Sequence, residues 1–100
     1  MSDTGFEVKK KEKVQVKEPP KFRVLLHNDD YTTMDFVVKI LEEVFHKSPA
    51  EATAIMLHVH HKGVGECGVY PAEIAETKVD TVHAKARAAG FPLLATMEEI

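Results

Sequence analysis

The sequence predicts an α+β fold in which a small three-stranded antiparallel sheet packs against three helices. Two observations support this prediction. Three short apolar runs have the length of strands, at residues 22–27, 64–70 and 92–97. Three longer segments have the apolar spacing of helices, and capping residues bound them. The elements follow one another as β-α-α-β-α-β, and their apolar faces are buried when the helices pack on the sheet.

The first strand, FRVLLH, has turn-forming residues on both sides, as a buried strand usually does. The helix that follows is expected to have Thr32 or Thr33 at its N-cap and to end near His46. Thr32 and Asp35 approximate a capping box in which Asp replaces the usual Glu. Apolar residues at helical spacing give this helix one buried face: Val37, Ile40, Leu41, Val44 and Phe45.

The second helix has a stronger start signal. Ser48 is the expected N-cap, Pro49 occupies the first helical position, and Glu51 completes a capping box. Gly63 is expected to end the helix. The inward stripe consists of Ala52, Ile55, Met56 and Val59.

The third helix is expected between Pro71 and Gly90, after a strand at residues 64–70 that glycines interrupt. PLLATM, residues 92–97, then closes the fold as the third strand. The apolar contacts of the third helix are expected from Ile74, Val79, Val82, Ala86 and Ala89.

The composition indicates one small domain, residues 22–100, after a disordered extension, residues 1–21. The extension is rich in Lys and Glu, so it cannot bury enough apolar surface to offset its ordering entropy. A net charge of −3 argues against a nucleic-acid partner. No apolar run approaches the roughly 20 residues of a membrane helix, and no apolar signal core is present. The single cysteine, Cys67, is expected to be structural, and a cytoplasmic location is expected.

A polar cluster, Asn28-Asp29-Asp30, lies between the first strand and the first helix. One interpretation is a turn that leads into a helix, because acidic residues near a helix N-terminus are stabilised by about 0.3–1 kcal/mol. Three such residues exceed what one cap requires. The surplus oxygens are suited to a cation, either a metal ion or an amine.

Chemical motifs are scarce. The phosphate-binding, nucleophile-elbow and zinc-protease motifs GxxxxGK[ST], GxSxG and HExxH are missing from the sequence. His58, His60 and His61 are close together, but no fourth ligand has the spacing of a zinc site, so surface imidazoles are the better interpretation. A metal-dependent hydrolase that uses Asp29, Asp30 and His60 remains an alternative, as does a purely structural interaction domain that resembles the C-terminal domain of the ribosomal stalk protein.

Four segments together resemble the ClpS adaptor family. They are NDDYTTMDFVVKIL, the A-x-x-x-M-L-x-V-H pattern at residues 52–60, GVGECGVYPAEIAETKV and PLLATMEE. The resemblance runs from about Phe22 to the C-terminus. It implies a monomeric adaptor of the bacterial N-end rule pathway, with no catalytic activity and no cofactor. Such an adaptor binds proteins that begin with Leu, Phe, Tyr or Trp and delivers them to the ClpA unfoldase of the ClpAP protease.

The resemblance also implies roles for individual residues. The amino-terminus site falls on Asn28, Asp29 and His60. Met34 occupies the position of a gate against β-branched side chains. The extension at residues 1–21 matches a segment needed for delivery. The side-chain pocket falls on Asp30, Thr32, Met34, Val37, Met56, Val59 and Leu93. The ClpA-contacting residues are Glu73, Thr77 and Lys78.

The chemistry of these residues agrees with such a role. A free α-amino group is mostly cationic at neutral pH, so Asp29 attracts it, while Asn28 and a neutral His60 can accept its N–H groups. Burying Leu or Phe contributes about 1.5–3 kcal/mol, and hydrogen bonds to a charged group contribute about 1.5–3 kcal/mol. A micromolar Kd needs about 8 kcal/mol, so neither half of the site suffices alone.

Overall fold

The computed structural model describes residues 18–100. The predicted disordered extension therefore lies outside the described residues, except for its last four. Of these, residues 18–20 have no regular secondary structure and Lys21 already belongs to the first strand.

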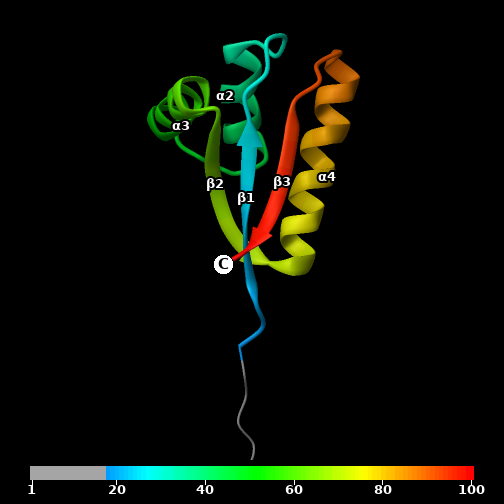
Figure 1. Cartoon of the computed structure of the whole chain (residues 1–100). Helices are drawn as coiled ribbons and strands as arrows, with labels where there is room; N and C mark the ends of the chain where they lie inside the picture. The colour runs from blue at the N-terminus through cyan, green and yellow to red at the C-terminus, as the bar shows by residue number, and fades with distance from the viewer. Residues whose placement is uncertain (1–17) are drawn as a thin grey trace, which may run out of the picture.

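The sheet is antiparallel and has the order β2-β1-β3, with β1 (Lys21–His27) in the centre. β2 (Val64–Pro71) and β3 (Leu94–Glu99) pair with its two edges. Figure 1 shows the three strands side by side, with the C-terminus beside the start of β1. Within residues 18–100 the helices are α2 (Met34–Glu43), α3 (Pro49–Lys62) and α4 (Ala72–Ala89). The predicted fold class is confirmed.

The two faces of the sheet differ sharply. Val24 and Leu26 of β1 are completely buried among the helices. The alternate residue Arg23 instead pairs with Glu66 of β2 at 3.2 Å and Glu98 of β3 at 2.9 Å. This alternation is the period-2 pattern of a sheet that is covered on one side. The helices therefore all contribute to one core.

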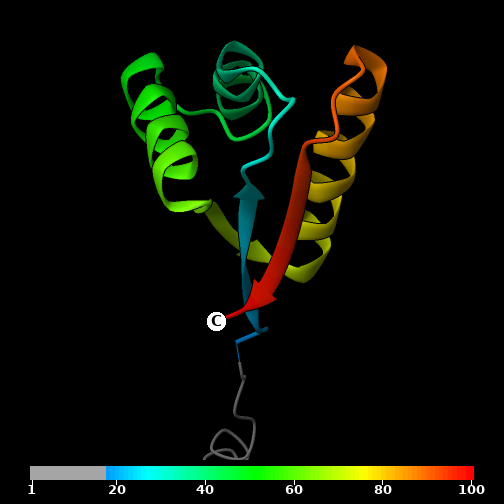
Figure 2. The ribbon, with the colours of Figure 1, turned by 45° about the horizontal axis from the view of Figure 1, so that its top comes forward.

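The helices form two groups over the covered face. α4 runs along the sheet on the β3 side, whereas α2 and α3 pack against each other beyond the end of β1 (Figures 1 and 2). Figure 2 shows α2 between α3 and α4. The loop that leaves β1 therefore emerges beside α2 and the last turn of α3, where the polar cluster lies.

The start of α3 and the ends of α3 and α4 lie where the sequence predicted them. Ser48 and Glu51 form the reciprocal capping box, with both hydrogen bonds at 3.1 Å. Gly63 and Gly90 end α3 and α4 with φ of 92° and 82°, a region that an L side chain disfavours.

The start of α2 differs from the predicted capping box. Thr33 is the N-cap and its hydroxyl accepts the Phe36 N–H at 3.1 Å. The prediction that Thr32 and Asp35 form a box is wrong, because Asp29 holds both the N–H and the hydroxyl of Thr32.

Other boundaries also shift. α2 ends at Glu43, before the predicted His46, which adopts a positive φ of 56°. β3 begins at Leu94 and extends to Glu99, two residues later than predicted at each end. Ile74, predicted to make apolar contacts, is 47% exposed, because the buried stripe of α4 runs through Ala75, Val82 and Ala86. Ala89, also predicted to make apolar contacts, is exposed at the end of α4.

Candidate functional site

The polar cluster is organised by the carboxylate of Asp29. Its Oδ1 accepts the N–H groups of Tyr31 at 2.8 Å and Thr32 at 2.7 Å. Its Oδ2 accepts the hydroxyl of Thr32 at 2.7 Å. An Asp that bonds the backbone two and three residues ahead closes a tight turn. The loop thus holds the Asp29 carboxylate in one orientation.

These hydrogen bonds also set the ionisation of Asp29. Partial desolvation raises the pKa of its carboxyl, but the hydrogen bonds from Thr32 and Tyr31 outweigh that effect and hold the pKa below its ordinary value. Asp29 is therefore a fixed negative charge at neutral pH. Asp29 is half-buried and its neighbour Asp30 is exposed, so the two adjacent carboxylates lie in different surroundings.

A backbone hydrogen bond brings this loop to the end of α3. The N–H of Asn28 donates to the carbonyl of Gly63 at 2.9 Å, and Gly63 is the C-cap of α3. His60 lies in the last turn of that helix and is exposed, with its ring edge-on to His61 at 5.3 Å. The polar loop is therefore held at the end of α3, the helix whose last turn carries His60.

The apolar residues assigned to the pocket come from three segments of one core. Val37 belongs to α2, Met56 and Val59 to α3, and Leu93 to the segment before β3. Each is at most 8% exposed. Met34 differs, since it is the first residue of α2 and is 46% exposed. Four of the assigned side chains are thus buried in the core, whereas Met34 is partly exposed at the start of α2.

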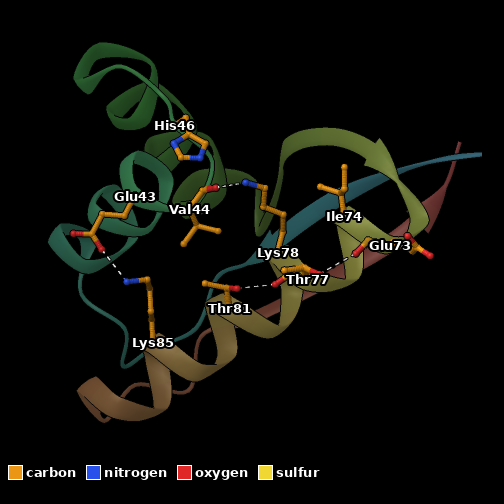
Figure 3. Close-up of a pocket in the computed structure, with 9 residues that line it drawn as sticks. All are labelled: Glu43, Val44, His46, Glu73, Ile74, Thr77, Lys78, Thr81 and Lys85. Carbon is orange, nitrogen blue, oxygen red and sulfur yellow. Dashed lines mark hydrogen bonds and ion pairs between the residues drawn. The ribbon is translucent and has the colours of Figure 1, made fainter.

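The residues assigned to partner contact lie on α4 and border a cleft of about 510 Å³ between α4 and the end of α2. Glu73 and Thr77 are exposed, and the half-buried Lys78 donates its Nζ to the Val44 carbonyl at 2.6 Å. Figure 3 shows this hydrogen bond and the ion pair between Lys85 and Glu43 at 3.3 Å. Lys78 therefore also satisfies a carbonyl at the C-terminus of α2, a role that the sequence pattern did not indicate.

Two further observations bear on chemistry. Cys67 is 1% exposed, and burial raises the pKa of its thiol to about 12, so it is a poor nucleophile. Among residues 18–100, no three His, Cys, Asp or Glu side chains are grouped closely enough to hold a metal ion.

Comparison with known proteins now identifies the family. Residues 17–96 match the family described as "ATP-dependent Clp protease adaptor protein ClpS". The chain belongs to the ClpS family. ClpS proteins are substrate adaptors and not enzymes, so the hydrolase alternative built on Asp29, Asp30 and His60 is wrong. None of the helices in residues 18–100 combines the length and apolar character needed to cross a membrane.

Relatives carry the same description. The ClpS of Nitratidesulfovibrio vulgaris (strain DSM 19637 / Miyazaki F) is 63% identical over 100 residues, which covers all of both chains. That of Oleidesulfovibrio alaskensis is 65% identical over 86 residues, or 86% of this chain and 83% of the relative. A solved structure, Agrobacterium tumefaciens ClpS2 bound to L-phenylalaninamide, superposes with a TM-score of 0.80 at 36% identity. It covers 83% of this chain and 100% of the other.

Two substitutions of Asp29 should separate its charge from its hydrogen bonds. Asn keeps an oxygen for the Tyr31 and Thr32 N–H groups, whereas Ala leaves both unpaired. We expect Asp29→Ala to lower the free energy of unfolding by about 1–3 kcal/mol and Asp29→Asn to lower it by less. Urea denaturation at pH 7 measures both changes.

The difference between wild type and Asp29→Asn should depend on pH. Because the folded-state pKa of Asp29 lies below its unfolded value, the carboxylate stabilises the fold above the ordinary Asp pKa of about 3.9. That stabilisation is lost as the pH falls through the folded-state value. A difference that stays constant from pH 7 to pH 2.5 would contradict the assignment.

Proposed function

We propose that this adaptor binds proteins with an N-terminal Leu, Phe, Tyr or Trp and delivers them to the ClpA unfoldase for degradation by ClpAP. The observation that carries the proposal is the ligand of the A. tumefaciens relative. L-Phenylalaninamide has a free α-amino group and an aromatic side chain, and its amide replaces the first peptide bond of a protein. It is the minimal form of an N-terminal phenylalanine.

The loop and the end of α3 offer suitable acceptors for the amino group. Within residues 18–100, Oδ2 of Asp29 accepts one hydrogen bond, so it retains acceptor capacity beside its full charge. The Asn28 side chain is exposed and can supply an amide oxygen, and a neutral His60 can supply a ring nitrogen. An ammonium has three N–H groups, whereas an internal peptide has one. Requiring several acceptors therefore selects a chain terminus.

The first side chain is proposed to enter beside Met34, above the four buried side chains assigned to the pocket. The thioethers of Met34 and Met56 can adapt both to Leu and to flat aromatic rings. A β-branched side chain carries its bulk next to the backbone, at the level of the exposed Met34. Met34 thus serves as a gate that admits Leu and aromatic residues and excludes Ile and Val.

A calorimetric titration tests the amino-terminus site. A peptide that begins with Phe should bind, and its N-acetylated form should bind at least about 100-fold more weakly, because acetylation removes the charge and leaves one N–H donor in place of three. Asp29→Asn should abolish binding of the free peptide while retaining the loop. Asp35→Asn is the matched control, since it removes an exposed carboxylate from the first turn of α2. Equal binding of the two peptides would overturn the proposal.

Met34→Ala tests the gate. Removing the thioether should open the rim of the proposed pocket, so that peptides beginning with Ile or Val bind within about tenfold of the Leu peptide. The Leu peptide should itself lose about 1–2 kcal/mol of binding free energy through lost apolar contact. Fluorescence anisotropy with the three peptides measures these changes. If the Ile and Val peptides remain unbound while the Leu peptide still binds, Met34 is not the gate.

The proposed ClpA surface is the exposed part of α4 around Glu73 and Thr77. Ile74 lies between them in the sequence and is 47% exposed, so this surface presents one apolar side chain flanked by polar groups. The cleft beside these residues extends to the end of α2 (Figure 3). Lys78 is a less suitable residue to mutate as a test, because its substitution also removes the hydrogen bond to Val44.

Glu73→Lys should weaken binding to the N-terminal domain of ClpA by at least tenfold and leave the affinity for a Phe peptide unchanged. Glu76→Lys is the matched control, because it places the same charge on an exposed position one turn along α4 that does not border the cleft. Biolayer interferometry measures the partner, and anisotropy measures the peptide. Equal losses for both variants would show a general charge effect in place of a local contact.

A further inference from the structure

The short segment that carries Leu93 is attached to α4 at both of its ends. The N–H of Phe91 donates to the carbonyl of Ala86 at 2.8 Å. The N–H of Ala95 donates to Nε2 of His83 at 3.0 Å. Ala86 and His83 are three residues apart on α4, so both attachments lie within one turn of the helix. The first is a backbone contact, and the second depends on one side chain.

The Ala95 hydrogen bond occupies a position where the sheet offers no partner. β3 is an edge strand, and Ala95 faces Leu26 of β1 on its paired side. Ala95 is only 2% exposed, so water cannot readily replace a missing acceptor. A buried N–H without a partner is costly. His83 satisfies it by accepting this N–H at Nε2.

The segment has room to move if this hydrogen bond is lost. A cleft of about 320 Å³ separates it from the last turns of α4, and both His83 and Leu93 border that cleft. On its other side, the ring of Phe91 contacts Phe36 of α2, with centroids 4.9 Å apart. The segment is therefore held by this aromatic contact, by the two hydrogen bonds to α4 and by the pairing of Leu94 and Ala95 with β1.

We propose that His83 is a positioning residue that holds Leu93 in the wall of the side-chain pocket. This inference rests on the proposed function. By accepting the N–H of Ala95, His83 keeps the segment from relaxing into the cleft beside α4. Leu93 then stays in the core cluster that also contains Val37, Met56 and Val59, and the pocket retains the shape that an N-terminal Leu or aromatic side chain requires. The role acts through Leu93, and His83 itself does not contact the bound peptide.

Two substitutions separate the hydrogen bond from the bulk of the imidazole. His83→Leu keeps an apolar side chain of similar size and removes the acceptor. His83→Gln supplies an amide oxygen at a comparable reach, so it should rescue the contact. Arg87→Ala is the control, because Arg87 borders the same cleft without bonding the segment. All three variants are made in the full chain.

The first readout is hydrogen exchange at the Ala95 amide, which does not depend on any ligand. His83→Leu should accelerate exchange at least tenfold relative to wild type, and His83→Gln should stay within about threefold. The second readout is affinity for a Leu-initiated peptide. His83→Leu should weaken it five- to tenfold, whereas His83→Gln and Arg87→Ala should remain close to wild type. Binding to the N-terminal domain of ClpA should be unchanged in all three.

The outcomes separate this inference from the proposed function. Unchanged exchange in His83→Leu would show that His83 does not hold the segment, and would overturn the inference. Faster exchange with unchanged peptide affinity would overturn the positioning role and leave the proposed function intact. Equal losses of peptide and partner binding would indicate general destabilisation and also overturn it. A wild-type chain that binds no Leu-initiated peptide would instead refute the proposed function.

Discussion

The central place of β1 in the sheet determines where the site can form. Both other strands pair with it, and its residues Val24 and Leu26 are fully buried, so a register shift of one residue would expose them. The chain must therefore leave the sheet at a fixed point, after His27. The Asn28 to Gly63 hydrogen bond continues the pairing of β1 and β2 by one more residue. The polar loop lies against the end of α3 because the backbone pairing of β1 and β2 extends to Asn28 and Gly63.

Within that frame, the loop is organised before any ligand arrives. Three hydrogen bonds hold the Asp29 carboxylate, and all three donors belong to residues 31 and 32. A side chain that is already ordered loses little entropy when it binds an amine. Val37, Val59 and Leu93, which we propose for the side-chain pocket, are also fixed, because they are buried in the main core. Met34, the proposed gate, differs because it is 46% exposed at the start of α2.

Local signals predicted the fold class and several boundaries, and distant contacts explain where the prediction differed. The Ser48 and Glu51 box and the two glycine C-caps involve neighbours in sequence, so they could be recognised directly. The Val44 carbonyl at the C-terminus of α2 is bonded by Lys78, which lies 34 residues further along the chain. The pocket residues Met56, Val59 and Leu93 look like ordinary core positions, and only the resemblance to ClpS proteins marked them out. The role of His83 could not be predicted from the sequence, because its partner is a backbone N–H on β3 and such a contact has no sequence pattern.

The burial of Cys67 gives this molecule an internal reporter. It is the single cysteine of the chain, and its side chain lies in the core among residues from the sheet and the helices. A thiol that is both inaccessible and protonated reacts slowly with alkylating reagents, so labelling requires the core to open. An adaptor of an ATP-dependent protease works beside an enzyme that degrades proteins. The rate of Cys67 alkylation can therefore be compared in the presence and absence of that enzyme. The comparison measures whether the adaptor itself stays folded while the protease degrades its substrates.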